Sequence, residues 1–140
     1  MKKTLIFLMT IVLLSSCTND DETPTNEILG KWKLVKVEYY KWNPNNASLQ
    51  TIDYSEKNIT YDFRLNNKLI ITGEDNIDNK NRESDYIFEK DYLSGQPSEG
   101  ESKMLLVKID GSKWTYSLTN GIMMLGQSYI DGADLYFERK

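Results

Sequence analysis

Hydrophobic and polar residues alternate along the chain from about residue 27 onward, with a period of two. In residues 59–65, and again in residues 114–119, every second side chain is apolar. This period is typical of antiparallel strands that bury one face and leave the other in water. Eight strands are predicted, at residues 31–41, 57–65, 68–73, 84–92, 103–109, 113–119, 122–126 and 133–139.

Turn-forming dipeptides lie between several of these strands, namely Asn66-Asn67, Asp110-Gly111, Asn120-Gly121 and Asp131-Gly132. Such short connections make sequential strands pair antiparallel, which produces a meander. Closing the sheet on itself removes both of its exposed edges, so a closed form is favoured over an open one. The predicted fold is therefore all-β: an eight-stranded antiparallel meander β-barrel, formed by one domain over residues 27–140. Only a short turn is expected before it, near residues 25–29.

Positions of equal parity define a predicted barrel interior that is rich in large side chains. In the first strand the apolar positions change parity between Leu34 and Val35, which indicates a bulge or a sharp coil. The predicted interior residues are Trp32, Leu34, Ile59, Tyr61, Phe63, Leu65, Tyr86, Phe88, Leu105, Val107, Ile109, Trp114, Tyr116, Leu118, Leu135 and Phe137. Eight strands enclose space for side chains or for one small molecule. The bulk of these residues favours a filled, or nearly filled, interior.

The first sixteen residues have the organisation of a secretory signal peptide. The chain begins Met-Lys-Lys, residues 4–14 form an apolar run, and two serines precede Cys17, the only cysteine. The run is too short for a membrane-spanning helix, which needs about 20 residues. The order Leu14-Ser15-Ser16-Cys17 resembles the bacterial lipobox. The resemblance implies cleavage after residue 16, a diacylglycerol on the thiol of Cys17 and acylation of the new amino group, for instance with palmitate; the alternative is a buried helix with an incidental cysteine.

Residues 17–26 are predicted to be the lipidated cysteine and a flexible acidic tether, because residues 18–26 contain no large apolar side chain. Several acyl chains on one cysteine hold a protein on a membrane essentially permanently. The expected location is the bacterial outer membrane, with the domain on the periplasmic or the surface-exposed face. The run Asp20-Asp21-Glu22 resembles the acidic export signal of some surface lipoproteins, and an ordinary solvated linker explains it equally well.

Composition narrows the chemistry that the domain can perform. The formal net charge is −4 and becomes more negative once residues 1–16 are removed, so phosphate backbones repel the domain and nucleic acid is not an expected partner. Histidine is absent and Cys17 is expected to be acylated, which excludes Ser/His, Cys/His and histidine–metal sites, as well as a disulfide within the chain. The remaining acids, such as Asp62, Glu89, Asp110 and Glu138, occupy polar-face or turn positions typical of solvated groups. Neither an enzyme nor a cofactor is expected.

Residues 74–81, Glu-Asp-Asn-Ile-Asp-Asn-Lys-Asn, superficially suggest a calcium site. Ile77 stands where a ligand is required, and Tyr86 stands where the bidentate glutamate of a calcium loop would be. A solvated acidic loop is the better interpretation, and no metal is expected.

Two segments of the domain resemble the lipocalins. Leu29-Gly30-Lys31-Trp32 looks like their Gly-x-Trp signature, and residues 134–139 are similar to the end of the short lipocalin-like domains that follow bacterial lipoprotein signals. In lipocalins this tryptophan lies at the closed end of the barrel, and an arginine from near the last strand stacks on it. The resemblance implies a structural signature of Gly30, Trp32 and Arg139, with Arg139 against Trp32 or, alternatively, loose in solvent. The chain lacks the second lipocalin motif, their disulfide and their long C-terminal helix, which argues against a large cavity.

Two functions are compatible with these patterns. By analogy with lipocalins, the barrel is expected to bind a small apolar or amphipathic ligand without catalysis, in an open end lined by Tyr61, Phe63, Tyr116 and Phe137. In the alternative, the interior is filled and the long loops at residues 43–56, 74–83 and 94–102 contact a partner protein or a glycan.

Aromatic residues at the end of the first strand bear on the second function. Tyr39, Tyr40 and Trp42 cluster where the chain enters the predicted loop of residues 43–56, and aromatic faces at a loop edge can stack on sugars or on an apolar ligand. The favoured interpretation is that Tyr39 packs inward and Trp42 covers the end of the barrel.

Overall fold

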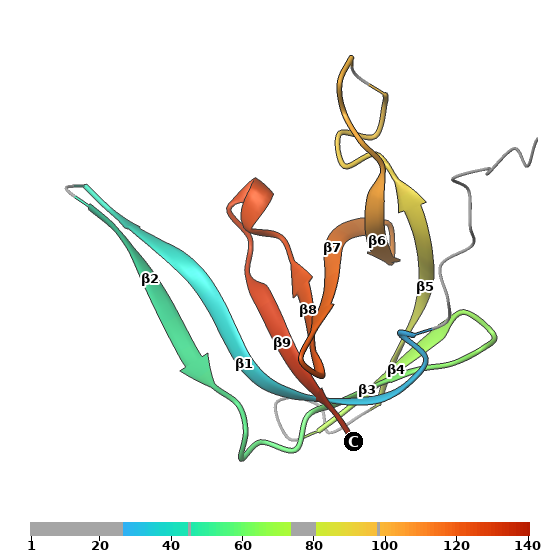
Figure 1. Ribbon diagram of the computed structural model, residues 1–140. Coiled ribbons are helices and arrows are strands. Elements are labelled where there is room, and N and C mark those ends of the chain that lie inside the picture. Colours follow the sequence, from blue (N-terminus) through green and yellow to red (C-terminus); the bar gives the residue numbers. More distant parts are fainter. Residues whose placement is uncertain (1–26, 45, 74–80, 98) are drawn as a thin grey trace, which may run out of the picture.

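The computed structural model of the protein describes residues 27–44, 46–73, 81–97 and 99–140 (Figure 1). The predicted signal peptide, Cys17, the tether and most of the candidate calcium loop lie outside these residues. The described elements are β1 (Gly30–Asn43), β2 (Asn46–Asp53), β3 (Thr60–Phe63), β4 (Lys68–Thr72), β5 (Arg82–Asp91), β6 (Met104–Ile109), β7 (Ser112–Thr119), β8 (Ile122–Gly126), the 3-10 turn η1 (Ser128–Ile130) and β9 (Asp134–Arg139).

Eight of the strands close into an antiparallel β-barrel, which confirms the predicted fold class. Their hydrogen-bonded order is β1-β3-β4-β5-β6-β7-β8-β9, and β9 pairs back onto β1. The closing pairs join Trp32 to Arg139 at one end and Glu38 to Asp134 at the other. A sheet closed in this way satisfies the backbone groups of its first and last strands without leaving a barrel edge exposed.

The ninth strand, β2, was not predicted from the sequence. Residues 43–56 were expected to be a loop, but Asn46–Asp53 pair with Lys36–Asn43 of β1. Figure 1 shows this β1–β2 hairpin projecting away from the rest of the sheet. All eight side chains of β2 are exposed or half-buried, so the strand forms by backbone pairing with the long β1 rather than by burying an apolar face. Alternation is therefore weak in its sequence, which is why the pattern misses it.

The predicted irregularity of the first strand is confirmed. The register of β1 against β9 shifts between Leu34 and Lys36, so that Leu34 and Val37 both border the barrel interior. The predicted turns carry the expected backbone strain. Asp110 and Gly111 have φ values of 48° and 84°, and Asn120 and Gly121 have 52° and 81°. Positive φ at both positions matches the twist of a tight hairpin, and Asn, Asp and Gly tolerate it best.

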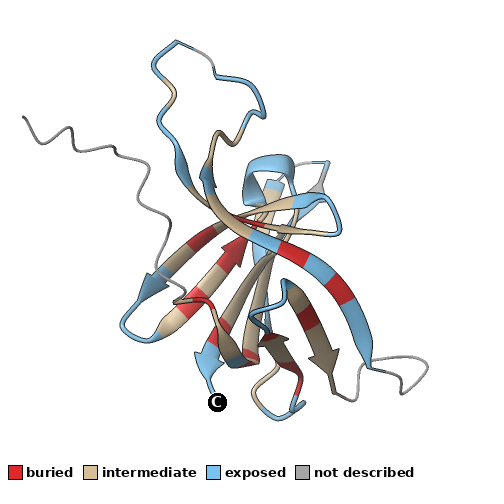
Figure 2. Cartoon of the chain, turned by 90° about the vertical axis from the view of Figure 1, so that its right-hand side faces the viewer, coloured by how far each residue is buried: buried red, intermediate tan, exposed pale blue. Residues whose placement is uncertain are grey.

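The core contains most, but not all, of the predicted interior residues (Figure 2). The prediction that Leu65 and Leu118 face the interior is wrong, since these side chains are 81% and 38% exposed. Leu65 follows the end of β3 and lies in a turn, and Leu118 is close to the end of β7, where little covers it. The parity pattern also missed five buried apolar residues that are at most 1% exposed, namely Ile28, Leu69, Leu106, Met123 and Leu125.

Candidate functional site

One end of the barrel is built around Trp32 and Arg139. The Cζ of Arg139 lies 4.2 Å from the centroid of the Trp32 ring, so the expected stacking contact is present. The indole Nε1 of Trp32 donates a hydrogen bond of 2.7 Å to the carbonyl oxygen of Ile28. Trp32 is 1% exposed, and its one polar atom is thereby satisfied inside the core.

Arg139 also holds the segment that covers this end. Its Nη1 donates to the carbonyl oxygen of Leu29 at 2.9 Å, and its Nη2 donates to that of Glu27 at 2.7 Å. Gly30 has a φ of 109°, and a Cβ there would lie 3.0 Å from Nη1 of Arg139. Gly30, Trp32 and Arg139, which were predicted as a structural signature, therefore meet, and Arg139 holds residues 27–29 while Ile28 is buried in the core. We call this group the closed end.

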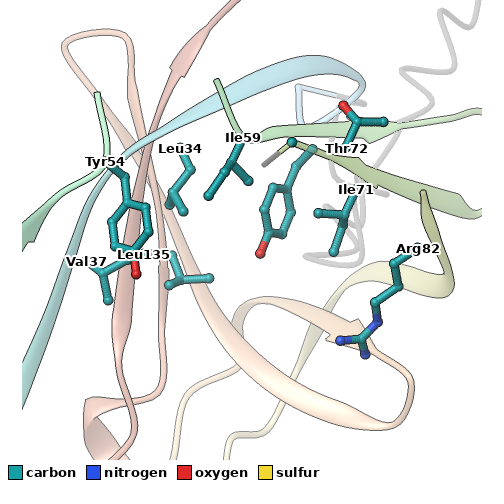
Figure 3. A pocket seen from close by; sticks show the side chains of 10 residues that line it. Leu34, Val37, Tyr54, Ile59, Ile71, Thr72, Arg82 and Leu135 are labelled. Carbon is teal, nitrogen blue, oxygen red and sulfur yellow. The ribbon is translucent and has the colours of Figure 1, made fainter. Parts of the chain in front are cut away.

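The opposite end of the barrel contains a cavity of about 350 Å³ (Figure 3). Strands β1, β3, β4, β5 and β9 contribute to its wall, together with the segment between β2 and β3. Its lining is mainly aliphatic and aromatic. The lining residues are Leu34, Val37, Tyr54, Ile59, Tyr61, Ile71, Thr72, Gly73, Arg82 and Leu135.

A second hollow of about 180 Å³ continues the first. The two hollows are adjacent, since they share the four lining residues Tyr61, Ile71, Arg82 and Leu135. We call them together the barrel mouth. The smaller hollow extends toward the turn between β6 and β7, where Asp110 and Ser112 line it together with Ile109 and Trp114.

Only one of the four residues predicted to line the open end does so. Tyr61 borders both hollows, whereas Phe63, Tyr116 and Phe137 line neither of them. These three are 1%, 9% and 0% exposed and lie in the packed core. Their rings pack edge to face, with centroid distances of 5.0 Å for Phe63–Tyr86, 4.8 Å for Tyr61–Phe137 and 4.8 Å for Phe88–Tyr116. The interior is thus filled toward the closed end and hollow at the barrel mouth.

The polar groups of the barrel mouth are few. Burial raises the pKa of the Tyr61 phenol, and the positive charge of Arg82 partly offsets this effect. Arg82 Nη2 donates a hydrogen bond of 3.2 Å to Oδ2 of Asp110, whose Oδ1 accepts one of 3.2 Å from the amide of Asp85. The Ser84 hydroxyl and the Arg82 guanidinium lower the pKa of the Asp110 carboxyl. Sequence patterns gave no signal for Arg82, because it stands alone at the start of a strand.

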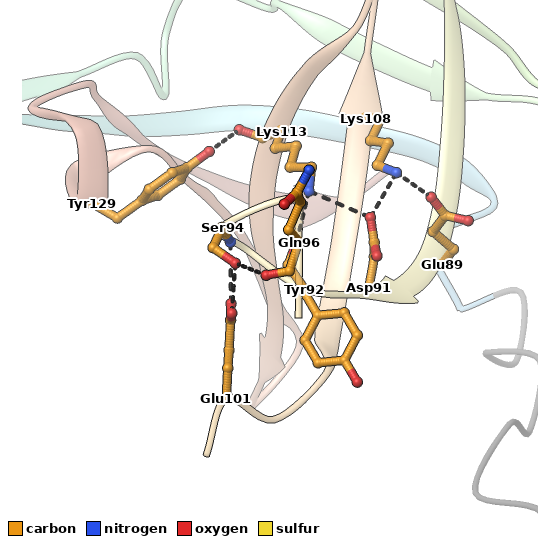
Figure 4. A network of polar contacts seen from close by, with 9 residues as sticks. All are labelled: Glu89, Asp91, Tyr92, Ser94, Gln96, Glu101, Lys108, Lys113 and Tyr129. Carbon is orange, nitrogen blue, oxygen red and sulfur yellow. Dashed lines mark hydrogen bonds and ion pairs between the residues drawn. The ribbon is translucent and has the colours of Figure 1, made fainter. Parts of the chain in front are cut away.

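A larger group of charged residues lies outside the barrel, on strands β5, β6 and β7 (Figure 4). Lys108 binds Glu89 at 2.5 Å and Asp91 at 2.8 Å, and Lys113 donates to the carbonyl oxygen of Tyr92 at 2.6 Å. These contacts lower the pKa of Asp91, chiefly through Lys108. The charges satisfy one another and brace the start of the loop after β5. We assign this group a structural role.

The three aromatics expected at a loop edge lie instead on the outer half of β1. Tyr40 is 50% and Trp42 68% exposed, so Trp42 does not cover the barrel end. Tyr40 pairs with Leu49 of β2, which is also 51% exposed, while Tyr39 is half-buried. Tyr40, Trp42 and Leu49 form what we call the hairpin patch.

No group of three potential metal-binding side chains occurs within residues 27–73 and 81–140, as far as these are described. In the same part of the chain, no helix has the length and apolar character needed to cross a membrane.

No protein family, curated protein or solved structure matches the chain significantly.

Proposed function

We propose that the protein is a lipid-anchored lipoprotein of the bacterial envelope whose lipocalin-like barrel holds a small apolar or amphipathic molecule, without catalysis. The observation that carries this proposal is the barrel mouth, whose larger hollow measures about 350 Å³. This volume falls within the range of about 300–1,000 Å³ that is usual for small-molecule sites. A barrel built only as a scaffold for its loops needs no such space.

The composition of the lining supports an apolar ligand. Leu34 and Val37 of β1, Ile59 before β3 and Leu135 of β9 give the hollow an aliphatic wall. An apolar molecule seated there gains about 25 cal/mol for each Å² of apolar surface removed from water. The wall is also made of strands, so the site exists before the ligand arrives, which lowers the entropic cost of binding.

The proposed anchor rests on the sequence alone. An apolar run followed by Leu14-Ser15-Ser16-Cys17 supports lipidation of Cys17, and the outer membrane is the proposed location. Growth with radiolabelled palmitate tests it, because the wild-type chain should become labelled and Cys17→Ser should not. Label that persists in the variant contradicts the anchor and leaves the binding proposal untouched.

Two neighbouring isoleucines allow a matched test of binding. Ile71 lines the barrel mouth, whereas Ile70 is its neighbour on β4, faces the outside and is similarly half-buried. The full chain, purified in a non-ionic detergent, is titrated with the neutral apolar dye N-phenyl-1-naphthylamine, and fluorescence above that of protein-free detergent is recorded. We expect saturable binding that Ile71→Gln weakens by about tenfold, the effect of placing an unpaired amide against an apolar ligand. Ile70→Gln should bind as wild type does. Equal binding by both variants, or no saturable binding, contradicts the proposal.

The hairpin patch supports a second candidate function, the contact of a partner protein or a glycan. Exposed Tyr and Trp side chains are enriched at such interfaces. Trp42→Ser and Tyr40→Ser should abolish retention on an immobilised glycan or protein partner if this function applies, and they should leave dye binding at the barrel mouth unchanged.

A further inference from the structure

The charged groups of the barrel mouth lie on one side of it. In Figure 3, Tyr54, Val37 and Leu135 gather on one side, and Arg82 stands on the opposite side. The smaller hollow, which contains Asp110, continues from the Arg82 side. The mouth thus has an apolar half between β1 and β9 and a polar half at the start of β5.

Arg82 is held so that part of its guanidinium remains available. Its Nη2 is bound to Asp110, while Nε and Nη1 have no hydrogen-bond partner within the residues that the structure describes. The side chain of Arg82 is 63% exposed, so water or a ligand can reach it. A planar guanidinium fixed at one corner presents two donors in the geometry that a carboxylate or phosphate accepts.

Two tyrosines add neutral hydrogen-bonding groups to the same space. Tyr61 and Tyr54 both line the larger hollow, and among the described residues neither hydroxyl has a hydrogen-bond partner. Tyr61 is close enough to Arg82 for the two to influence each other electrostatically. A head group placed beside Arg82 therefore meets a fixed positive charge with a phenol nearby, and the rest of the ligand meets Leu34, Val37 and Leu135.

We propose that the ligand of the barrel mouth is a single-chain amphiphile with an oxyanion head, such as a carboxylate, which binds the free edge of Arg82 while its apolar chain lies against β1 and β9. This inference rests on the proposed function, since it specifies the ligand of the same cavity. Asp110 is part of the site because it fixes the orientation of Arg82. A neutral amphiphile would leave the guanidinium with water alone and gain only the apolar contacts.

The test compares two ligands that differ only in the head group. Decanoate and 1-decanol share an apolar chain, and each is added at equal concentration to the full chain in non-ionic detergent. The midpoint of thermal unfolding is followed by tryptophan fluorescence, because a ligand that binds the folded state raises it. Three proteins are compared: wild type, Arg82→Gln and Arg64→Gln. Arg64 is the matched control, since it is also an exposed arginine paired with an aspartate, Asp62 at 3.1 Å, and it does not line the mouth.

We expect decanoate to stabilise wild type and Arg64→Gln more than decanol does, with an affinity ratio of about ten, as follows from one charge-assisted hydrogen-bonded contact at a partly exposed site. In Arg82→Gln the two ligands should become equivalent. Micelles take up part of each ligand, but they do so equally for all three proteins, so the change in the ratio between variants reports on Arg82.

Each contrary result has a distinct meaning. If decanoate and decanol stabilise all three proteins equally, the barrel mouth binds apolar chains and the oxyanion inference is overturned. If Arg64→Gln loses the preference as fully as Arg82→Gln does, general surface charge causes it, and the inference is again overturned. If neither ligand shifts the midpoint of any protein, the proposed function itself fails for this class of molecule.

Discussion

Replacing Arg139 should open the closed end of the barrel and destabilise the whole protein. Arg139 makes two hydrogen bonds from an ionised donor, to Leu29 at 2.9 Å and to Glu27 at 2.7 Å, and it stacks on Trp32 at 4.2 Å. Each such hydrogen bond contributes about 1 kcal/mol when the guanidinium is partly exposed, and the stacking contributes about 0.5–1 kcal/mol. Arg139→Ala should therefore lower the free energy of unfolding by about 2–3 kcal/mol.

The measurement is urea unfolding followed by the fluorescence of the three tryptophans, of which Trp32 lies in the closed end. Arg139→Lys keeps the charge but offers one donor group in place of a planar fork, so it should lose about half as much stability. Arg64→Ala is the control, because an exposed ion pair contributes at most about 1 kcal/mol. Amide hydrogen exchange in residues 28–34 should also quicken in Arg139→Ala, since the segment that crosses the barrel end loses its two carbonyl contacts.

Arg139 does not hold the closed end if Arg139→Ala unfolds at the same urea concentration as wild type, or loses no more stability than Arg64→Ala. Either result would mean that Trp32 and Ile28 close the barrel end by packing alone and that the arginine only rests on their surface.

Two further predictions concern a backbone position and a charge. Gly73→Ala should lower the free energy of unfolding by about 2–4 kcal/mol, because φ is 140° and a Cβ would lie 2.7 Å from the Cα of Ile59. Gly121→Ala, where a Cβ would have no heavy atom within 4 Å, should lower it by about 1 kcal/mol. Equal losses of stability in urea unfolding would contradict this prediction. Lys108 lowers the pKa of Asp91, so the stability from this pair exists above about pH 4 and is lost as the pH falls. Asp91→Asn should flatten the fall in urea midpoint between pH 7 and pH 3, and an unchanged profile would refute it.

The barrel itself could be predicted because its strands obey local rules. Alternation places most inward residues correctly, and positive φ at Asp110 and Asn120 appears where Asp-Gly and Asn-Gly were expected. The position of the bulge near Leu34 also follows from a change in parity that any reader of the sequence can find. Each of these signals depends on only two to eight consecutive residues.

β2 could not be predicted because its cause is not local. Asn46–Asp53 would show no strand pattern in isolation, and Leu49 and Ile52 are 51% and 40% exposed. The strand exists because β1 offers it a backbone ladder from Lys36 to Asn43, and beyond Glu38 β1 runs past the barrel wall. The aromatic residues Tyr40 and Trp42 were noticed from the sequence, but their exposure follows from this unexpected hairpin.

The cavity could not be predicted because parity says which side chains face inward, not which ones share a layer. The layers depend on register: Phe137 lies opposite Met123 and Leu34, while Leu135 lies opposite Leu125 and Val37. Once the register is known, the fully buried rings Trp32, Phe63 and Phe137 prove to lie toward the closed end. The mouth is lined by aliphatic side chains together with the partly exposed rings Tyr54, Tyr61 and Trp114. Average bulk therefore predicted a filled interior, whereas the distribution of bulk along the barrel axis leaves one half hollow.

Because one end of the barrel is packed and the other is hollow, the two ends can have separate roles in stability and in binding. The closed end is held by contacts that reach from residue 27 to residue 139. At the mouth, side-chain bonds such as Tyr136–Glu38 and Arg82–Asp110 also join strands, but the interior between them is hollow. A ligand at the mouth would fill the hollow part of the barrel. Because it binds only the folded state, it would raise the free energy of unfolding of the whole barrel. Replacing Arg139 should lower the free energy of unfolding of the ligand-free protein. The affinity of a ligand for the folded barrel mouth should stay the same. The ligand-induced shift in the midpoint of thermal unfolding is compared between wild type and Arg139→Lys. If the mouth is built independently of the closed end, both proteins bind the ligand with the same affinity.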